Sequence, residues 1–232
     1  METITEIPFS LDAAALMELL HIPPDSEDAG DFRAFLAIAE KVGRPKAAYA
    51  VSYVEGRDGD TLKIGDTVFT SRTLSRQLAS AERVFPVVAT CGAEMDEANP
   101  AQGDMLKEFW WDAIKAQLLA AASRHLSDFL HRRFRLGKTA TMRPGAGDAS
   151  VWPIEQQRGL FALLGDVEQA IGVRLTGSFL MVPNKTTSGI LFAAEADFRS
   201  CQVCHRQGCP SRQAPFDPKL WAAIQHDEVD TQ

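Results

Sequence analysis

The sequence predicts an α+β fold with one long central helix, and three observations support this prediction. Apolar residues recur at three- and four-residue steps from about residue 105 to 134, the spacing of an amphipathic helix. Apolar runs at 83–89 and 189–194 are typical of buried strands. Because 45% of the 232 residues are hydrophobic, the chain can bury a substantial core.

Two helices are expected near the N-terminus. The first carries leucines at helical spacing, has Ser10 as its N-cap, and ends before the prolines at 23–24. The second is expected over 31–42, because Gly43 and Pro45 follow it and cannot continue it.

A hairpin and a short helix should come next. Residues 47–54 are rich in β-branched and aromatic side chains, and the turn-forming run at 56–60 leads to a second strand at 62–64. A helix is predicted over 71–78. In the following strand, at 83–89, Pro86 favours an edge position or a bulge.

The second half of the chain begins with the long helix and continues with a glycine-rich loop at 144–148. We expect one helix over 154–171 and two strands, at 174–182 and 189–194, which the polar turn at 183–188 separates.

The charge balance argues against two classes of partner. Acidic residues outnumber basic ones by 31 to 24, giving a net charge of −7, so attraction to nucleic acid or anionic lipid has no general electrostatic basis. The sequence has no cationic leader and no apolar stretch of membrane-spanning length. We therefore expect a cytoplasmic protein with neither nucleic acid nor membrane as partner.

Three of the four cysteines form a C-x2-C-x4-C-P motif, and Cys201, Cys204 and Cys209 are therefore candidate metal ligands. A fourth ligand could be His205, Cys91 or a group from a partner. The spacing leaves open zinc, an iron–sulfur cluster, or reduced thiols without a metal. A hydrolase or nucleotidase function has little support, since the sequence has neither the Gly-x-Ser-x-Gly motif of a nucleophile elbow nor a P-loop.

Three segments, in order and spacing, resemble the S-adenosylmethionine-binding activation domain of vitamin B12-dependent methionine synthase. They are PGAGD at 144–148, the stretch PIEQQRGLFALLGDVEQAIGV at 153–173, and RLTGSFLMVPNKTTSGILF at 174–192. The long helix and the stretch at 89–97 look similar to stand-alone members of this family. The resemblance divides the chain into an N-terminal helical segment (1–44), the activation-like domain (45–198) and a Cys-rich C-terminal extension (199–232).

The resemblance implies a mixed α/β domain that binds S-adenosylmethionine and docks over a corrinoid. Its expected function is the reductive reactivation of cob(II)alamin in a methionine synthase or another corrinoid methyltransferase, with a reductase as a further partner. The alternative is a metal-binding electron-transfer protein of the same fold that no longer binds S-adenosylmethionine. A non-catalytic scaffold is the third possibility.

The candidate cofactor-binding residues come from two turns, which we expect to form two walls of one concave surface. Glycines in the first turn would let main-chain groups approach a ligand closely. The family's arginine before this turn and its tyrosine within it fall on Thr141 and Ala146, so Arg143 could take the arginine's role. The candidates are Arg143, Pro144, Gly145, Ala146, Gly147, Asp148, Lys185 and Ser188.

Overall fold

The computed structural model describes residues 1–147, 150–195, 197–209 and 212–225. Within these residues, eight strands form one antiparallel sheet, in the order β1-β2-β6-β3-β4-β5, with β10 and then β7 branching from β6. The strands are β1 (Glu2–Ile4), β2 (Lys46–Tyr49), β3 (Ser52–Asp58), β4 (Thr61–Ile64), β5 (Thr67–Thr70), β6 (Arg83–Thr90), β7 (Thr139–Met142) and β10 (Thr186–Ala193). The predicted α+β class with an antiparallel sheet is confirmed.

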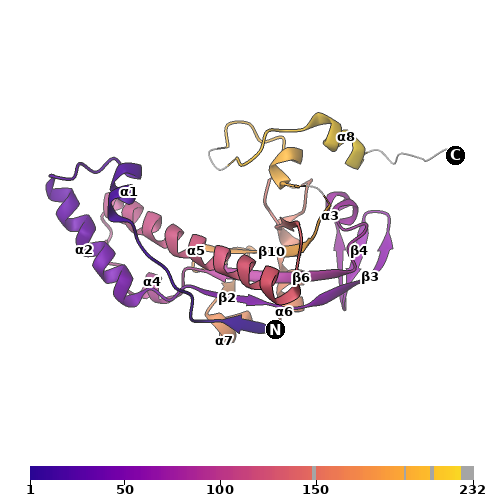
Figure 1. Cartoon of the computed structure of the whole chain (residues 1–232), viewed down its shortest axis with the longest axis horizontal. Coiled ribbons are helices and arrows are strands. Elements are labelled where there is room, and N and C mark those ends of the chain that lie inside the picture. Colours follow the sequence, from indigo (N-terminus) through magenta and orange to yellow (C-terminus); the bar gives the residue numbers. More distant parts are fainter. Residues whose placement is uncertain (148–149, 196, 210–211, 226–232) are drawn as a thin grey trace.

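Helices surround this sheet, and one of them spans much of the molecule (Figure 1). The helices are α1 (Ala13–Leu19), α2 (Glu27–Val42), α3 (Arg72–Gln77), α4 (Glu94–Glu97), α5 (Met105–Phe134), α6 (Gln157–Leu164), α7 (Val167–Ile171) and α8 (Pro218–Gln225). Short 3-10 turns cover Ile154–Gln156 and Ser200–Val203. Figure 1 shows α1 and α2 at one end of the molecule and the β3–β4 hairpin at the other. No helix among the described residues is long and apolar enough to span a bilayer.

Helix α5 joins two parts of the core. Its first half buries Trp110 and Trp111, whose rings meet Phe35 of α2 edge to face at 6.4 and 6.0 Å between centroids. Its second half buries Ala122 and Leu126 against β6 and β10. The predicted helix is therefore confirmed at both ends, because its apolar stripe is continuous over the 30 residues.

The C-terminal segment packs into the core. Val203 and Ile224 are buried in the same apolar cluster as Leu62 of β4 and Phe192 of β10. The sequence analysis did not predict α8, whose apolar residues Leu220, Trp221 and Ile224 join this cluster and which packs on α3 and on the 3-10 turn Ser200–Val203.

Several element boundaries differ from the predictions. Asp12 and Ser26, not Ser10, cap the first two helices, and α2 begins four residues earlier than expected. The expected helix at 154–171 breaks at Gly165, where φ is +90°. The expected strand at 174–182 is a short hairpin, β8 (Arg174–Leu175) with β9 (Met181–Val182).

Strand β6 is central, so the edge position predicted from Pro86 is wrong. On one side, β6 pairs with β3 at Arg83 and Val84 and then with β2 from Val87 to Thr90. Pro86 lies opposite the link between those two partners, and its carbonyl accepts from the amide of Ala50 at 3.0 Å. Proline has no backbone N–H to donate, and at Pro86 this missing donor falls where the neighbour of β6 changes from β3 to β2.

Candidate functional site

A cavity of about 770 Å³ lies where the sheet, α5, the glycine turn and the C-terminal segment meet. The sheet contributes residues of β6, β7 and β10, such as Thr141 and Leu191, and α5 contributes Ser123, Leu126 and Ser127. Ser123 and Ser127 are four positions apart and so share one helix face. A volume of this size falls in the range of small-molecule sites.

The glycine-rich loop, here called the glycine turn together with the preceding Arg143, forms one wall of the cavity. Arg143, Gly145, Ala146 and Gly147 all line it. The two glycines have φ of +73° and +101°, a conformation that favours glycine. The amide of Gly145 donates to the carbonyl of Trp152 at 2.8 Å, which closes the turn.

The two remaining candidates in this turn have different outcomes. Pro144 is part of the turn but does not line the cavity. Asp148 lies outside the described residues.

Strand β10 forms the adjoining wall. Thr187 and Ser188 border the cavity, and Nε of Arg143 donates to Oγ1 of Thr187 at 3.1 Å. The hydroxyl of the buried Ser188 accepts from Nε2 of Gln157 on α6 at 2.6 Å, so it is already engaged by the protein. The glycine turn and the first part of β10 therefore border one concave surface, whereas the turn around Lys185 had been expected as its second wall.

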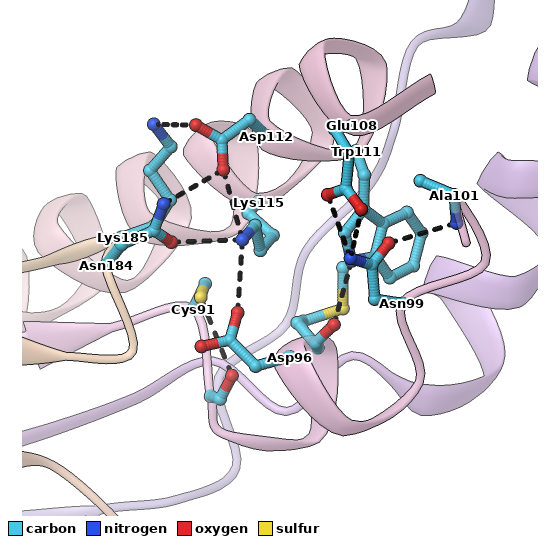
Figure 2. Close-up of polar contacts among 12 residues, drawn as sticks. Cys91, Asp96, Asn99, Ala101, Glu108, Trp111, Asp112, Lys115, Asn184 and Lys185 are labelled. Atoms are coloured by element: carbon cyan, nitrogen blue, oxygen red, sulfur yellow. Dashed lines mark hydrogen bonds and ion pairs between the residues drawn. The ribbon is translucent and has the colours of Figure 1, made fainter. Parts of the chain in front are cut away.

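Lys185 itself does not line this cavity, and Figure 2 shows it in a polar network with α5. Its Nζ lies 2.7 Å from Oδ2 of Asp112. The neighbouring Asn184 donates to Asp112 and accepts from Lys115, which also bonds Asp96 at 3.1 Å. The network ties the turn before β10 to α4 and α5, so it positions that wall of the cavity.

The network perturbs the acidity of its members. Burial of Asp112 opposes ionisation, but hydrogen bonds from Lys185, Asn184 and Lys115 outweigh it and lower the pKa of Asp112 to about 2. The aspartate is therefore charged at neutral pH and holds both lysines.

Cys91 lies beside this network rather than in the cavity. It is fully buried, and its amide donates to the carbonyl of Lys185 at 3.0 Å. Burial, assisted by the nearby charge of Asp96, raises the pKa of its thiol to about 12. The thiol is therefore neutral and poorly nucleophilic.

The motif cysteines, by contrast, all line the cavity. Cys201, Cys204 and Cys209 border it, and Arg212 holds their loop by donating to four carbonyls, including those of Cys201 and Cys204. In the part of the chain that the structure describes, no three His, Cys, Asp or Glu side chains gather as a metal-binding group. The described residues thus give no support to the zinc or iron–sulfur alternatives.

Several cavity residues were not among the sequence candidates. They are small hydroxyl residues of α5 and β7 and the arginines of the C-terminal segment. The four-residue spacing of Ser123 and Ser127 was the only available signal, and it is common on solvated helices. The missed residues are Ser123, Ser127, Thr139, Thr141, Thr187, Arg199, Arg206 and Arg212.

The fold is similar to that of a solved structure. A crystal structure of the MetH reactivation domain bound to AdoHcy matches with a TM-score of 0.57 and 18% identity, covering 82% of this chain and 69% of that chain. At this identity the likeness concerns the fold. Among curated proteins, none has a sequence that matches this chain.

A family model agrees with the fold and covers most of the cavity walls. The model described as vitamin B12 dependent methionine synthase, activation domain, matches residues 105–207. This region contains α5, the glycine turn, β10 and the first two motif cysteines. Residues 105–207 are therefore similar to the activation-domain family of vitamin B12 dependent methionine synthase.

Proposed function

We propose that this protein assists the reductive reactivation of cob(II)alamin in a B12-dependent methionine synthase or a related corrinoid methyltransferase. In this reaction one electron reduces cob(II)alamin, and S-adenosylmethionine then gives its methyl group to cobalt and leaves as S-adenosylhomocysteine. The chain would supply the binding surface that orients the methyl donor, while the corrinoid belongs to the partner.

The observation that carries the proposal is the cavity itself. Most of its walls lie within the region that the family model matches, and it joins a glycine turn to hydroxyl-bearing strands. The structure bound to AdoHcy has a similar fold. Arg143 is well placed to bind a carboxylate bidentately, since its guanidinium borders the cavity and only its Nε is used by Thr187 among the described residues.

The proposal includes a corrinoid protein and a reductase as partners, and the cytoplasm as location. Four free cysteines are consistent with that location. Because the motif thiols do not gather as ligands, no electron-transfer step through a metal is assigned to them.

A turnover assay tests the proposal. A corrinoid methyltransferase is oxidised to its cob(II)alamin form and then supplied with S-adenosylmethionine and a reductant. Adding this protein should restore turnover. Arg143→Gln should restore about tenfold less at limiting S-adenosylmethionine, since a charge-assisted hydrogen bond contributes about 1.5–3 kcal/mol.

The matched control is Arg174→Gln, which removes an exposed arginine of β8 that does not border the cavity. It should behave as the unmodified protein. Absence of any restoration by the unmodified protein, across methionine synthases and other corrinoid methyltransferases, would contradict the proposal.

A further inference from the structure

The charge of the cavity is opposite to that of the whole chain. The protein has a net charge of −7. Among the described residues that line the cavity, one is acidic, Asp197, and four are arginines, namely Arg143, Arg199, Arg206 and Arg212. A concave surface with excess positive charge attracts anions, and its low-dielectric walls strengthen that attraction.

Two of these arginines keep most of their hydrogen-bonding capacity for a ligand. Arg143 uses Nε to reach Thr187, and Arg199 uses Nη1 to reach Gln213 at 3.0 Å. Each guanidinium has five N–H groups, so several remain on each. No carboxylate among the described residues forms an ion pair with either one.

Arg212 has a different role. Its Nη atoms donate to main-chain carbonyls of the cysteine loop, so its side chain is committed to holding that loop. This loop and the neighbouring Val203, which is buried in the core, fix the segment that presents Arg199. Arg199 therefore lies on a segment that is packed against the core.

The two guanidiniums are also close enough to affect each other. Arg143 is exposed by surface area, but desolvation by the surrounding protein lowers its pKa, and the positive charge of Arg199 lowers it further. Like charges in one cavity destabilise each other, and an anion between them would relieve that repulsion.

We propose that the cavity contains an oxyanion site in which Arg143, from the glycine turn, and Arg199, from the C-terminal segment, together bind a phosphate group. Two forked donors lining one cavity suit an anion with several acceptor oxygens. The proposal goes beyond the reactivation function, because S-adenosylmethionine has no phosphate and its sulfonium is positively charged; phosphate and the carboxylate of S-adenosylmethionine would compete for Arg143. The ligand class is a phosphate-bearing small molecule.

Titration of the full chain with inorganic phosphate, followed by ³¹P NMR line broadening at constant ionic strength, tests this site. Binding should be saturable. Arg199→Gln and Arg143→Gln should each raise the dissociation constant roughly tenfold or more, since each removes charge-assisted hydrogen bonds. Arg199→Lys should have an intermediate effect, because it keeps the charge but loses the fork. The control Arg174→Gln should bind as the unmodified protein does.

A second variant keeps the test valid if Arg199→Gln fails to fold. Gln213→Glu is nearly isosteric and places a carboxylate beside Arg199, so it should also weaken phosphate binding. Non-saturable line broadening, or equal binding by the folded Arg199→Gln or Gln213→Glu variants, would overturn the proposal. The titration contains neither partner nor S-adenosylmethionine, so its failure leaves the reactivation assay independent.

Discussion

At the scale of single residues, the polar turn before β10 acts through its contacts with α5. Lys185, expected to meet a ligand directly, is bound to Asp112. Lys115, whose side chain is only 9% exposed, bonds the same aspartate and Asp96. A buried lysine needs such partners, because an unpaired buried charge is costly. These residues therefore act as positioning groups for the adjoining cavity wall.

The lowered pKa of Asp112 gives this network a pH dependence. Its folded-state pKa is about 2, against an ordinary value of 3.8. The stability it contributes is therefore fully present above about pH 4 and is lost as the pH falls towards 2. The free energy of unfolding, measured by urea titration between pH 5 and 2, should fall less steeply in Asp112→Asn than in the unmodified protein. Asp128→Asn, an exposed change on the same helix, should keep the original slope.

The cysteines should differ in reactivity. Cys91 is buried with a thiol pKa of about 12, whereas Cys201 and Cys209 are partly exposed. Iodoacetamide at pH 8, read by peptide mass spectrometry, should label Cys201 and Cys209 well before Cys91. In urea all four should react alike. Equal labelling of Cys91 and Cys201 in the folded protein would contradict the assignment.

At the scale of elements, the cavity depends on the pairing of β7 with β10. Gly189 of β10 lies beside the end of β7, where an added Cβ would collide with the carbonyl oxygen of Met142. That oxygen belongs to the backbone, so the strand would have to move. β7 carries Thr139 and Thr141 into the cavity. A glycine at position 189 therefore allows β7 to pair with β10 and to line the cavity.

Gly189→Ala should lower the free energy of unfolding by about 1–3 kcal/mol, the usual cost of overpacking, and should also weaken ligand binding in the cavity. Gly30→Ala is the matched control. It lies in α2 with nothing within 4 Å of the added Cβ, so it should stabilise the protein by about 0.5–1 kcal/mol. Chemical denaturation of both variants checks this pair. Equal unfolding midpoints would show that β7 and β10 tolerate the methyl group.

Sequence patterns predicted those helices and strands that depend mainly on neighbouring residues in the sequence. The apolar stripe of α5 is continuous, and its ends were found from sequence. The break at Gly165 was missed, because the apolar periodicity continues into α7 and hides the change in backbone conformation. Pro86 misled the prediction for β6, since the partner change opposite it depends on two other strands.

Of the candidate site, one part was recognised from the sequence and another part was missed. The glycine turn was recognised from its resemblance to the activation-domain family, and its glycines have the positive φ that favours glycine. Arg199 and Thr139 were not, because only tertiary packing brings them to the turn.

At the scale of the whole molecule, four separate parts of the chain create the cavity. Helix α5, the glycine turn, β10 and the C-terminal segment meet there, and each is held elsewhere by the core (Figure 1). The C-terminal segment supplies the motif cysteines and three of the lining arginines. Removing residues 199–232 should therefore abolish the enclosed site and expose part of the core around Phe192 and Leu62. Increased binding of a hydrophobic dye to the truncated chain would register that exposure, and unchanged dye binding would contradict it.

The cavity is the proposed site of the adenosyl ligand. Calorimetric titration of S-adenosylhomocysteine into the full chain tests it most directly, together with Ser123→Trp, which fills the cavity from α5, and Arg124→Trp at the exposed neighbouring position. We predict saturable binding to one site that Ser123→Trp abolishes and Arg124→Trp preserves. No binding to the unmodified protein, or undiminished binding to a folded Ser123→Trp variant, would contradict the account.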